Sequence, residues 1–349
     1  MVNDEILFLA RIAVALISLL FLLLVYLMIR KMWEIKKRKE IDSYKDKINP
    51  FFFSIIVEGE FSRALGFGTS IKLKAIEELL SRYVKILEGE EERKRLSDLA
   101  SLYLQDYYRK LLKNRRWSRR MNALYHIEDF HMTVLKEDVI QLITKKTLSK
   151  RENVQVLRIL ASFQTNGFPD LLKNHEHYLN EYDYRSILMR LNQGLFEQFV
   201  LQFHKSSNSL QLAILDVISL KKANIYRAFT ESVFTAYKGE VRIRALKALA
   251  EIGDMQDVEP CLEMMYSPEW QERMVAAKLI GSIKEERGIP RLIELLHDHS
   301  WWVRSQAGQS ISQFPNGKSI LQSVLARSKD AFARDMAWDW LHKGDNYAK

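Results

Sequence analysis

The chain has 349 residues, a formal net charge of +9 and a pI near 9.3. Apolar residues make up 47% and aromatic residues 11%, which excludes an intrinsically disordered chain. Only 13 Gly and 6 Pro occur, whereas sandwiches and barrels depend on many Gly- and Pro-rich turns, so the composition favours an all-α fold. The single cysteine, Cys261, excludes an internal disulfide framework and a Cys-rich zinc site.

The N-terminal residues predict a transmembrane helix. Residues 6–29 form an apolar run that contains one charge, Arg11. A helix rises about 1.5 Å per residue, so roughly 20 such residues cross the hydrocarbon of a bilayer. A cleaved signal peptide is the alternative, but Asp4 and Glu5 precede the run where a signal peptide is basic, and no small-residue cleavage site follows. We therefore expect residues 1–29 to be a retained membrane anchor.

The charges that follow the apolar run predict its orientation. These juxtamembrane cations are Arg30, Lys31, Lys36, Lys37, Arg38 and Lys39, and Glu34 opposes them. Positive residues stay on the cytoplasmic side, so we expect a short N-terminus outside and the rest of the chain in the cytoplasm. Residues 30–49 are then a basic juxtamembrane linker facing an anionic leaflet. A plain stop-transfer signal explains the same charges.

A helical N-terminal region is expected at residues 50–112. The dipeptide Asn49-Pro50 predicts a break, after which residues 51–57, FFFSIIV, either pack on the following helices or dip into the membrane interface. A second break is expected at residues 66–68, with Ser70 as the N-cap of the next helix. Amphipathic helical spacing then recurs along the chain, and no stretch has a convincing period of two.

Internal repeats are the strongest pattern in the sequence. The segments that begin near residues 240, 271 and 302 align with a period of 31 residues. The repeated positions are Arg242, Arg273 and Arg304, then Ala245, Ala276 and Ala307. A further copy begins near Arg334, and weaker copies extend back to Trp117. Each repeat is a pair of helices that cannot bury its apolar faces alone, so the pairs are expected to stack.

The repeated segments VRIRALKALAEIGDMQDVEPCLEMM and RMVAAKLIGSIKEERGIPRLIELLHD resemble the short HEAT-like repeats of phycobilin-lyase-type proteins. The resemblance is good over residues 239–300 and moderate over 301–342, where Ser310 and Pro315 depart from apolar and Gly positions. Over 113–238 only the period and the apolar spacing agree. The resemblance implies an all-α fold with a HEAT-like α-solenoid at residues 113–349, and implies little about function.

The repeated residues have structural interpretations. The small Ala side chains let neighbouring helices approach closely. A phosphate-binding ladder is one interpretation of the repeated Arg residues. Because they recur at the structural period, we instead expect them to pair with carbonyls or acids of the adjoining repeat. The candidate acids are Asp254, Asp257, Asp298 and Glu269.

A basic cluster without any acid between residues 107 and 127 is the main candidate binding site. It comprises Arg109, Lys110, Lys113, Arg115, Arg116, Arg119 and Arg120. Anionic lipid, an acidic partner and nucleic-acid phosphate would each fit it, and a solvated helix end is the structural alternative. Residues 30–39 carry +5 and this cluster +7, so the remaining chain is 3 units negative and the solenoid itself is not basic.

No catalytic or metal-binding constellation is visible. The pairs His175/His177 and His297/His299 are spaced i,i+2, which places their side chains on different faces of a helix. Trp270 and Trp301 are expected to pack between repeats. Cys261 is expected to be a buried apolar residue rather than a nucleophile. We expect no metal, no cofactor and no small-molecule substrate.

The function expected from these features is that of a membrane-anchored scaffold. Its repeats would bind and position a protein partner at the inner membrane face, for example a membrane enzyme such as a glycosyltransferase, without catalysis of its own. The compact single-anchor plan suggests a bacterial chain. One alternative is a nucleic-acid-acting solenoid resembling HEAT-like DNA glycosylases, against which the anchor argues. Another is a lyase- or chaperone-type enzyme acting on a chromophore or lipid, by analogy with the repeat family.

Overall fold

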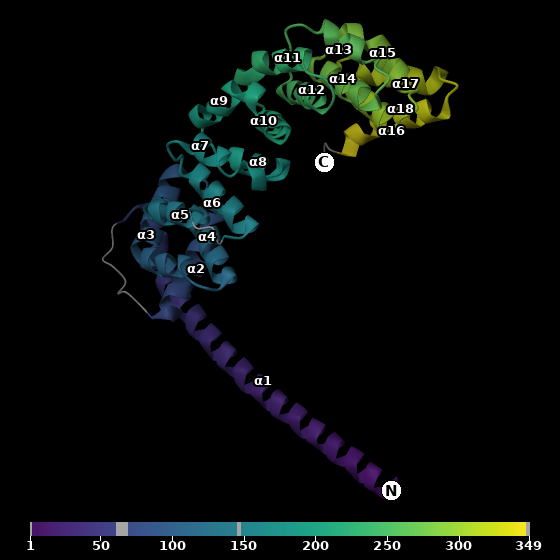
Figure 1. Ribbon diagram of the computed structural model, residues 1–349. Helices are drawn as coiled ribbons and strands as arrows, with labels where there is room; N and C mark the ends of the chain where they lie inside the picture. Colours follow the sequence, from purple (N-terminus) through teal and green to yellow (C-terminus); the bar gives the residue numbers. More distant parts are fainter. Residues whose placement is uncertain (1, 61–68, 145–147, 347–349) are drawn as a thin grey trace. The chain divides into compact units, whose positions relative to one another are not determined.

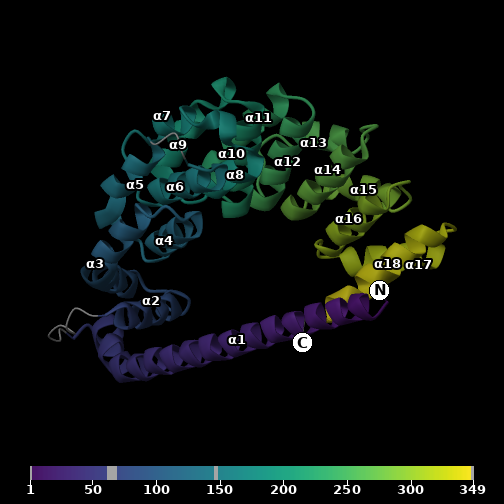
Figure 2. The same cartoon turned by 60° about the horizontal axis from the view of Figure 1, so that its bottom comes forward.

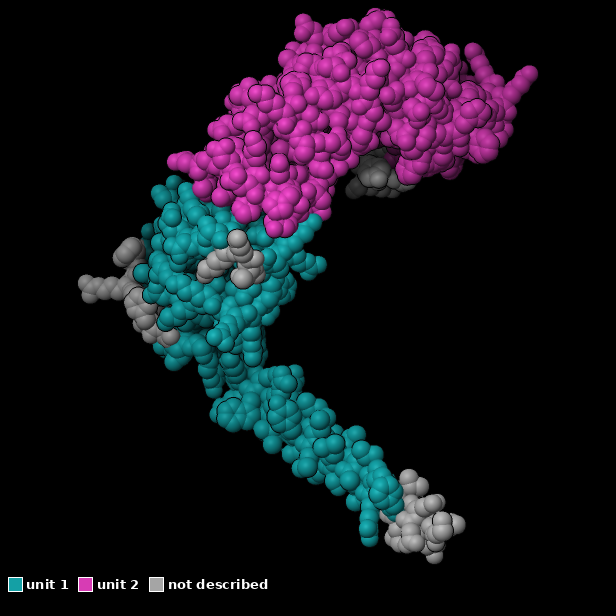
Figure 3. Space-filling model, viewed as in Figure 1, with its two compact units in different colours: residues 1–163 teal, residues 164–349 magenta. Residues whose placement is uncertain are grey.

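The computed structural model describes residues 2–60, 69–144 and 148–346. Within these ranges the chain forms helices and short connections, with no β-strand (Figure 1). The all-α class expected from the composition is therefore confirmed. The chain divides into two compact units, residues 1–163 and 164–349, which Figure 3 shows in different colours.

The first unit contains one very long helix and a set of shorter ones. Its elements are α1 (Val2–Phe53), the π-helical turn η1 (Ser54–Glu58), α2 (Ser70–Val84), α3 (Glu90–Leu112), α4 (Trp117–Asp129), the 3-10 turn η2 (Thr133–Leu135), α5 (Lys136–Ile143) and α6 (Lys150–Ser162).

Helix α1 has an exposed part and a packed part. From Arg11 to Glu40 every residue is exposed, whereas Ile41, Ile48 and Phe52 are buried against the other helices of the unit. Its N-terminal segment, with a mean hydropathy of 3.0 and no burial, is long and apolar enough to cross a membrane; a signal sequence meets the same criterion.

The break expected at Asn49-Pro50 does not occur, because α1 continues through Pro50 to Phe53. Proline removes one backbone donor from the helix, but Ile48, Phe52 and Ile56 follow one another at a spacing of four and are all buried. The burial of this stripe keeps the segment helical. Residues 51–57 thus pack on the following helices, as one of the two sequence interpretations predicted.

The second expected break, at residues 66–68, lies outside the described residues. Helix α2 begins at Ser70, and its N-cap is Thr69 rather than Ser70.

A buried polar cluster joins α2, α3 and α4. Tyr108 of α3 is fully buried and donates a hydrogen bond to Glu77 Oε2 of α2 over 2.8 Å. Lys74 pairs with the same carboxylate, and His126 of α4 lies 3.6 Å from it. The Tyr108 and His126 rings also stack. These contacts fix the relative positions of three helices inside the first unit.

The second unit consists of helices that stack in chain order. Its elements are α7 (Phe168–Lys173), η3 (Glu176–Tyr178), α8 (Glu181–Leu188), α9 (Gln193–Leu201), η4 (Phe203–Lys205), α10 (Asn208–Lys221), η5 (Asn224–Tyr226), α11 (Arg227–Ala236), α12 (Glu240–Ile252), α13 (Glu259–Met264), α14 (Trp270–Ile283), η6 (Glu286–Gly288), α15 (Ile289–Leu295), α16 (Trp301–Ser312), α17 (Gly317–Arg327) and α18 (Ala331–Asn346).

The even-numbered helices from α8 to α18 form a row in which each packs on the next, and α11, α13, α15 and α17 each pack on members of that row (Figure 2). The repeated Ala245, Ala276 and Ala307 are fully buried in this row. Ser310, which departs from the apolar repeat pattern, is buried against Gly281 of α14 and donates a hydrogen bond to Ala277 O. A small hydroxyl is therefore accommodated where two helices lie closest.

Candidate functional site

Two members of the basic cluster are occupied by contacts within the first unit. Arg109 binds Asp138 over 3.1 Å and Asp106 over 2.9 Å. Arg120 binds the buried carboxylate of Glu152 over 2.7 Å and donates to the carbonyls of Asn114 and Arg115. These two arginines hold helices together and are not available to a ligand.

The remaining five cations form what we call the basic surface. They are all exposed, and within the described residues none has an ion pair: Lys110, Lys113, Arg115, Arg116 and Arg119. They lie at the C-terminus of α3, in the turn and at the N-terminus of α4. The first turn of α4 contains no acid and its N-cap makes no side-chain hydrogen bond, so the positive end of the helix dipole adds to the charge.

Two neighbouring features give the basic surface shape. The Trp117 ring is 43% exposed between the arginines, and its Nε1 donates to Ser149 Oγ over 3.0 Å, which fixes the ring. A pocket of about 360 Å³ lies at the turn between α3 and α4, lined by Lys113, Asn114 and Arg115 among others. A surface with three exposed arginines and an aromatic ring suits phosphate-bearing anions, which arginine binds through two parallel hydrogen bonds.

The juxtamembrane cations lie on the exposed side of α1. Arg30 and Lys31 reach Glu34 over 3.4 and 3.9 Å, at distances and exposures where a surface ion pair contributes little. Arg38 instead reaches across to Glu78 of α2 over 2.8 Å. Lys36, Lys37 and Lys39 are exposed.

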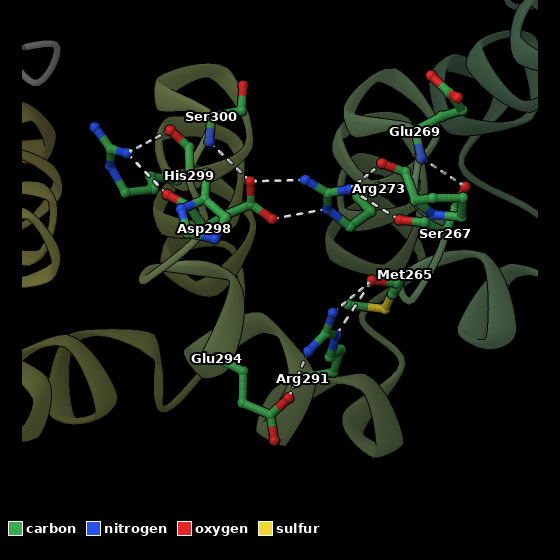
Figure 4. A network of polar contacts seen from close by, with 11 residues as sticks. Met265, Ser267, Glu269, Arg273, Arg291, Glu294, Asp298, His299 and Ser300 are labelled. Carbon is green, nitrogen blue, oxygen red and sulfur yellow. Dashed lines mark hydrogen bonds and ion pairs between the residues drawn. The ribbon is translucent and has the colours of Figure 1, made fainter.

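Among the repeated arginines, Arg273 binds carbonyl groups and an acid (Figure 4). Arg273 of α14 holds Asp298 with two parallel hydrogen bonds of 2.7 and 2.8 Å, and its third nitrogen binds the carbonyls of Ser267 and Pro268. Burial alone would raise the pKa of Asp298, but the bonds from Arg273 and Ser300 outweigh it, so that pKa lies below its ordinary value.

The same carbonyl pattern recurs at three other positions. Arg304 binds the carbonyls five and six residues before it, and so do Arg334 and Arg120. The guanidinium of Arg242 lies 5.1 Å from the ring of Phe234, and that of Arg304 also lies 4.9 Å from the ring of Phe332. Guanidinium groups engaged in this way do not form a ladder for phosphate. The alignment of the internal repeats did not identify Arg120. The repeat that contains Arg120 shares little with the others apart from Trp117 at the start of the helix.

Ion pairs also cross the row of even-numbered helices. Asp216 of α10 is buried between Arg185 of α8, at 3.2 Å, and Arg244 of α12, at 2.6 Å. Lys278 of α14 pairs with Glu251 of α12. The charged side chains on this row therefore connect consecutive helices.

Exposed aromatic residues recur at the repeat period, and Phe332 extends the pair Trp270 and Trp301 by one repeat. Trp270, Trp301 and Phe332 are spaced by 31 residues and are 37%, 49% and 63% exposed. Trp270 and Trp301, which are expected to pack between repeats, are thus only partly covered. Each stands at the first or second residue of its helix, and the Arg304 guanidinium of α16 lies 4.9 Å from the ring of Phe332. We call these three residues the aromatic row.

A pocket of about 740 Å³ lies where the start of α3 meets the end of α4. Burial raises the pKa of Asp129 and lowers that of His131, both of which line it. His131 has a left-handed backbone, φ 50°, and its carbonyl accepts a hydrogen bond from Ser97. No sequence pattern marked this pocket.

The other candidates from the sequence have ordinary structural surroundings. His297 contacts Ile293 O and Ser328 Oγ, and no group of three metal-ligating side chains occurs in the part of the chain that the structure describes. Cys261 is fully buried, and burial raises the pKa of its thiol to about 12.

Comparison with known proteins supports the repeat assignment. Residues 226–312 and 258–339 match the family model described as HEAT repeats. Two crystal structures of engineered proteins from a structural genomics consortium align with the chain. The first has a TM-score of 0.35, 16% identity, and coverage of 80% of this chain and 82% of that chain. The second has a TM-score of 0.28, 14% identity, and coverage of 78% and 96%. No curated protein sequence matches the chain.

Proposed function

Because residues 226–339 are HEAT repeats, we propose that this chain is a membrane-anchored scaffold. Its repeats bind a protein partner and hold it at the cytoplasmic face of a membrane, and the chain performs no catalysis of its own. HEAT repeats generally mediate protein–protein interactions, and stacked helix pairs present long surfaces suited to that purpose.

The observation that carries the anchor is the uncovered apolar segment of α1. Residues 12–29 are uncharged and exposed at 18 consecutive positions, and within the described part of the first unit no other helix packs on them. At about 1.5 Å per residue this segment is about 27 Å long, close to the thickness of bilayer hydrocarbon. The cations after Ile29 support the cytoplasmic orientation of the remaining chain.

The aromatic row supports a protein partner. Trp and Phe side chains that stay exposed in a regular line are typical of protein interfaces, where aromatic residues are enriched. A tethered scaffold reaches only what lies near its anchor, so the partner class we propose is a membrane enzyme, such as a glycosyltransferase, or a protein bound to one.

The test is affinity purification of the tagged full-length chain from detergent-solubilised membranes of its native cells. We expect one specific partner to co-purify, and to be lost when Trp270, Trp301 and Phe332 are replaced by Ser. The control replaces three other exposed large side chains of the same unit, those of Tyr182, Leu201 and Leu220, by Ser and should retain the partner. Extraction of the chain by alkaline carbonate without detergent would contradict the anchor.

A further inference from the structure

The position of the basic surface follows from the direction of α3. Helix α3 packs against η1 at its N-terminal end, where the Arg95 guanidinium lies against Gly59. Further along, Tyr103 contacts the ring of Phe52, with centroids 6.2 Å apart. Later residues of α3 thus contact earlier residues of the chain around the end of α1, so the two helices run antiparallel.

A second set of contacts gives the same direction. Tyr108 of α3 binds Glu77 of α2. The next residue of α2, Glu78, binds Arg38 and Lys45 of α1, over 2.8 and 3.0 Å. Tyr108 is therefore level with residues 38–45 of α1. The C-terminus of α3 lies another turn nearer to the apolar segment.

The basic surface therefore lies at the end of the first unit that faces the apolar segment. The end of α3 at Leu112 is therefore level with residues of about 34–41 in α1, which is roughly 8–18 Å beyond Ile29 along the helix. Lipid headgroups occupy about 5–8 Å of that distance. Three effects cover the remaining distance to the headgroups. They are the average tilt of a membrane helix, which is about 20°, the length of Lys and Arg side chains, and the Debye length of about 8 Å.

We propose that the basic surface binds the anionic lipid headgroups of the membrane in which α1 is anchored, as a second contact that orients the first unit. This inference rests on the proposed anchor. The five cations of the basic surface have no acidic partner among the described residues, and they lie on the side where an anionic leaflet would be. The exposed juxtamembrane cations Lys36, Lys37 and Lys39 lie on the same side. Trp117, an aromatic residue with a polar edge, has the character of residues found at membrane interfaces.

Lipid is favoured over an acidic protein because of this placement. A partner would be free to meet any face of the unit, whereas a membrane is presented only to the end from which α1 leaves. Cations near an anionic surface contribute at most about 1 kcal/mol each, and this attraction falls off within a Debye length. A cluster of cations is consequently required for a measurable orienting effect.

The experiment measures the distance of the basic surface from lipid headgroups. A fluorophore is attached to the Ser118→Cys variant of the full-length chain; position 118 is exposed, and Cys261 is buried and does not react. The chain is reconstituted in nanodiscs that carry a headgroup-linked quencher, made of phosphatidylcholine with or without phosphatidylserine. We expect severalfold stronger quenching with phosphatidylserine, reduced by added salt.

Two charge variants in the same background provide the comparison. Replacing Lys110, Lys113, Arg115, Arg116 and Arg119 by Gln should remove most of the phosphatidylserine-dependent quenching. The matched control removes five exposed cations of the second unit and should retain the phosphatidylserine-dependent quenching. These cations are Lys173, Lys205, Lys238, Lys247 and Lys329.

Equal quenching in both lipid compositions, with the chain still inserted, would overturn the inference and leave the anchor intact. Failure of the chain to insert into either nanodisc would instead refute the anchor. Shielding of the label by a co-purified acidic protein, without dependence on phosphatidylserine, would assign the surface to a partner and also overturn the inference. Equal loss of quenching in both charge variants would likewise overturn the inference.

Discussion

At the scale of single residues, the arginines of this protein have contrasting surroundings that the sequence does not distinguish. Arg273 and Arg287 are both close to carboxylates, with hydrogen bonds of 2.7 and 3.0 Å. The side chain of Arg273 is only 13% exposed and Asp298 only 8%, whereas Arg287 and Glu259 are about 60% exposed. Removing one member of a buried pair leaves an uncompensated charge, whereas an exposed pair is largely screened by water.

We predict that Arg273→Gln destabilises the chain by about 3 kcal/mol, and that Arg287→Gln leaves its stability unchanged within error. Urea unfolding of the full-length chain in detergent, followed by circular dichroism, measures both. The Asp298 carboxyl adds a pH signature. Because its pKa is lowered in the folded state, its stabilising effect is complete above the ordinary Asp pKa and is lost as the pH falls through the lowered value.

The difference between wild type and Arg273→Gln should therefore shrink below about pH 4. A difference that is independent of pH between 7 and about 3 would mean that Asp298 is not the group Arg273 stabilises.

At the scale of elements, α1 combines two environments in one continuous helix. Its first part is exposed and uncharged from residue 12 to residue 29, and its last turns carry a narrow buried stripe that packs on α2, α3 and η1. A rigid connection of this kind transmits the orientation of the anchor to the first unit. The contacts of Arg38 and Lys45 with Glu78 of α2 hold the first unit in place relative to the apolar segment.

We predict that Phe52→Ala weakens the packing of α1 by about 3 kcal/mol, since the ring is fully buried. Leu20→Ala, in the exposed apolar segment, should leave this packing unchanged because Leu20 is 70% exposed. Hydrogen exchange of the full-length chain in nanodiscs measures the effect as lost protection of residues 41–53. Equal protection in both variants would show that Phe52 does not hold the helix in place.

At the scale of the whole molecule, stability is distributed over neighbouring repeats. Each even-numbered helix of the second unit packs mainly on the one before and the one after it, so a local change is expected to remain local. Helix α18 is the last described member of that row, and Trp340 packs against Gly308 of α16. Trp338, two residues earlier, points away and is 55% exposed.

We predict that Trp340→Ala destabilises the last repeats by about 3 kcal/mol and that Trp338→Ala changes their stability by less than about 1 kcal/mol. Exchange protection should fall in α16–α18 and be unchanged in the first unit. Loss of protection throughout both units would show that the chain unfolds as one cooperative block instead of repeat by repeat.

The sequence by itself determined the helical class, the HEAT repeats and the apolar N-terminal segment. These depend on periodic patterns: helical spacing of apolar residues, recurrence of Arg and Ala every 31 residues, and 18 uncharged residues in succession. Burial of Ala245, Ala276 and Ala307 follows from the same pattern, because stacked helices require small residues at their closest approach.

Only the tertiary structure decided which charges are available and where they lie. Arg109 and Arg120 are indistinguishable from their neighbours in the sequence, yet each meets an acid from another helix about 30 residues away. The continuity of α1 through Pro50 and the exposure of Trp301 also depend on which helix packs where. Contacts between residues distant in sequence leave no periodic pattern, and for this reason the antiparallel course of α3, which places the basic surface, emerges only from the folded chain.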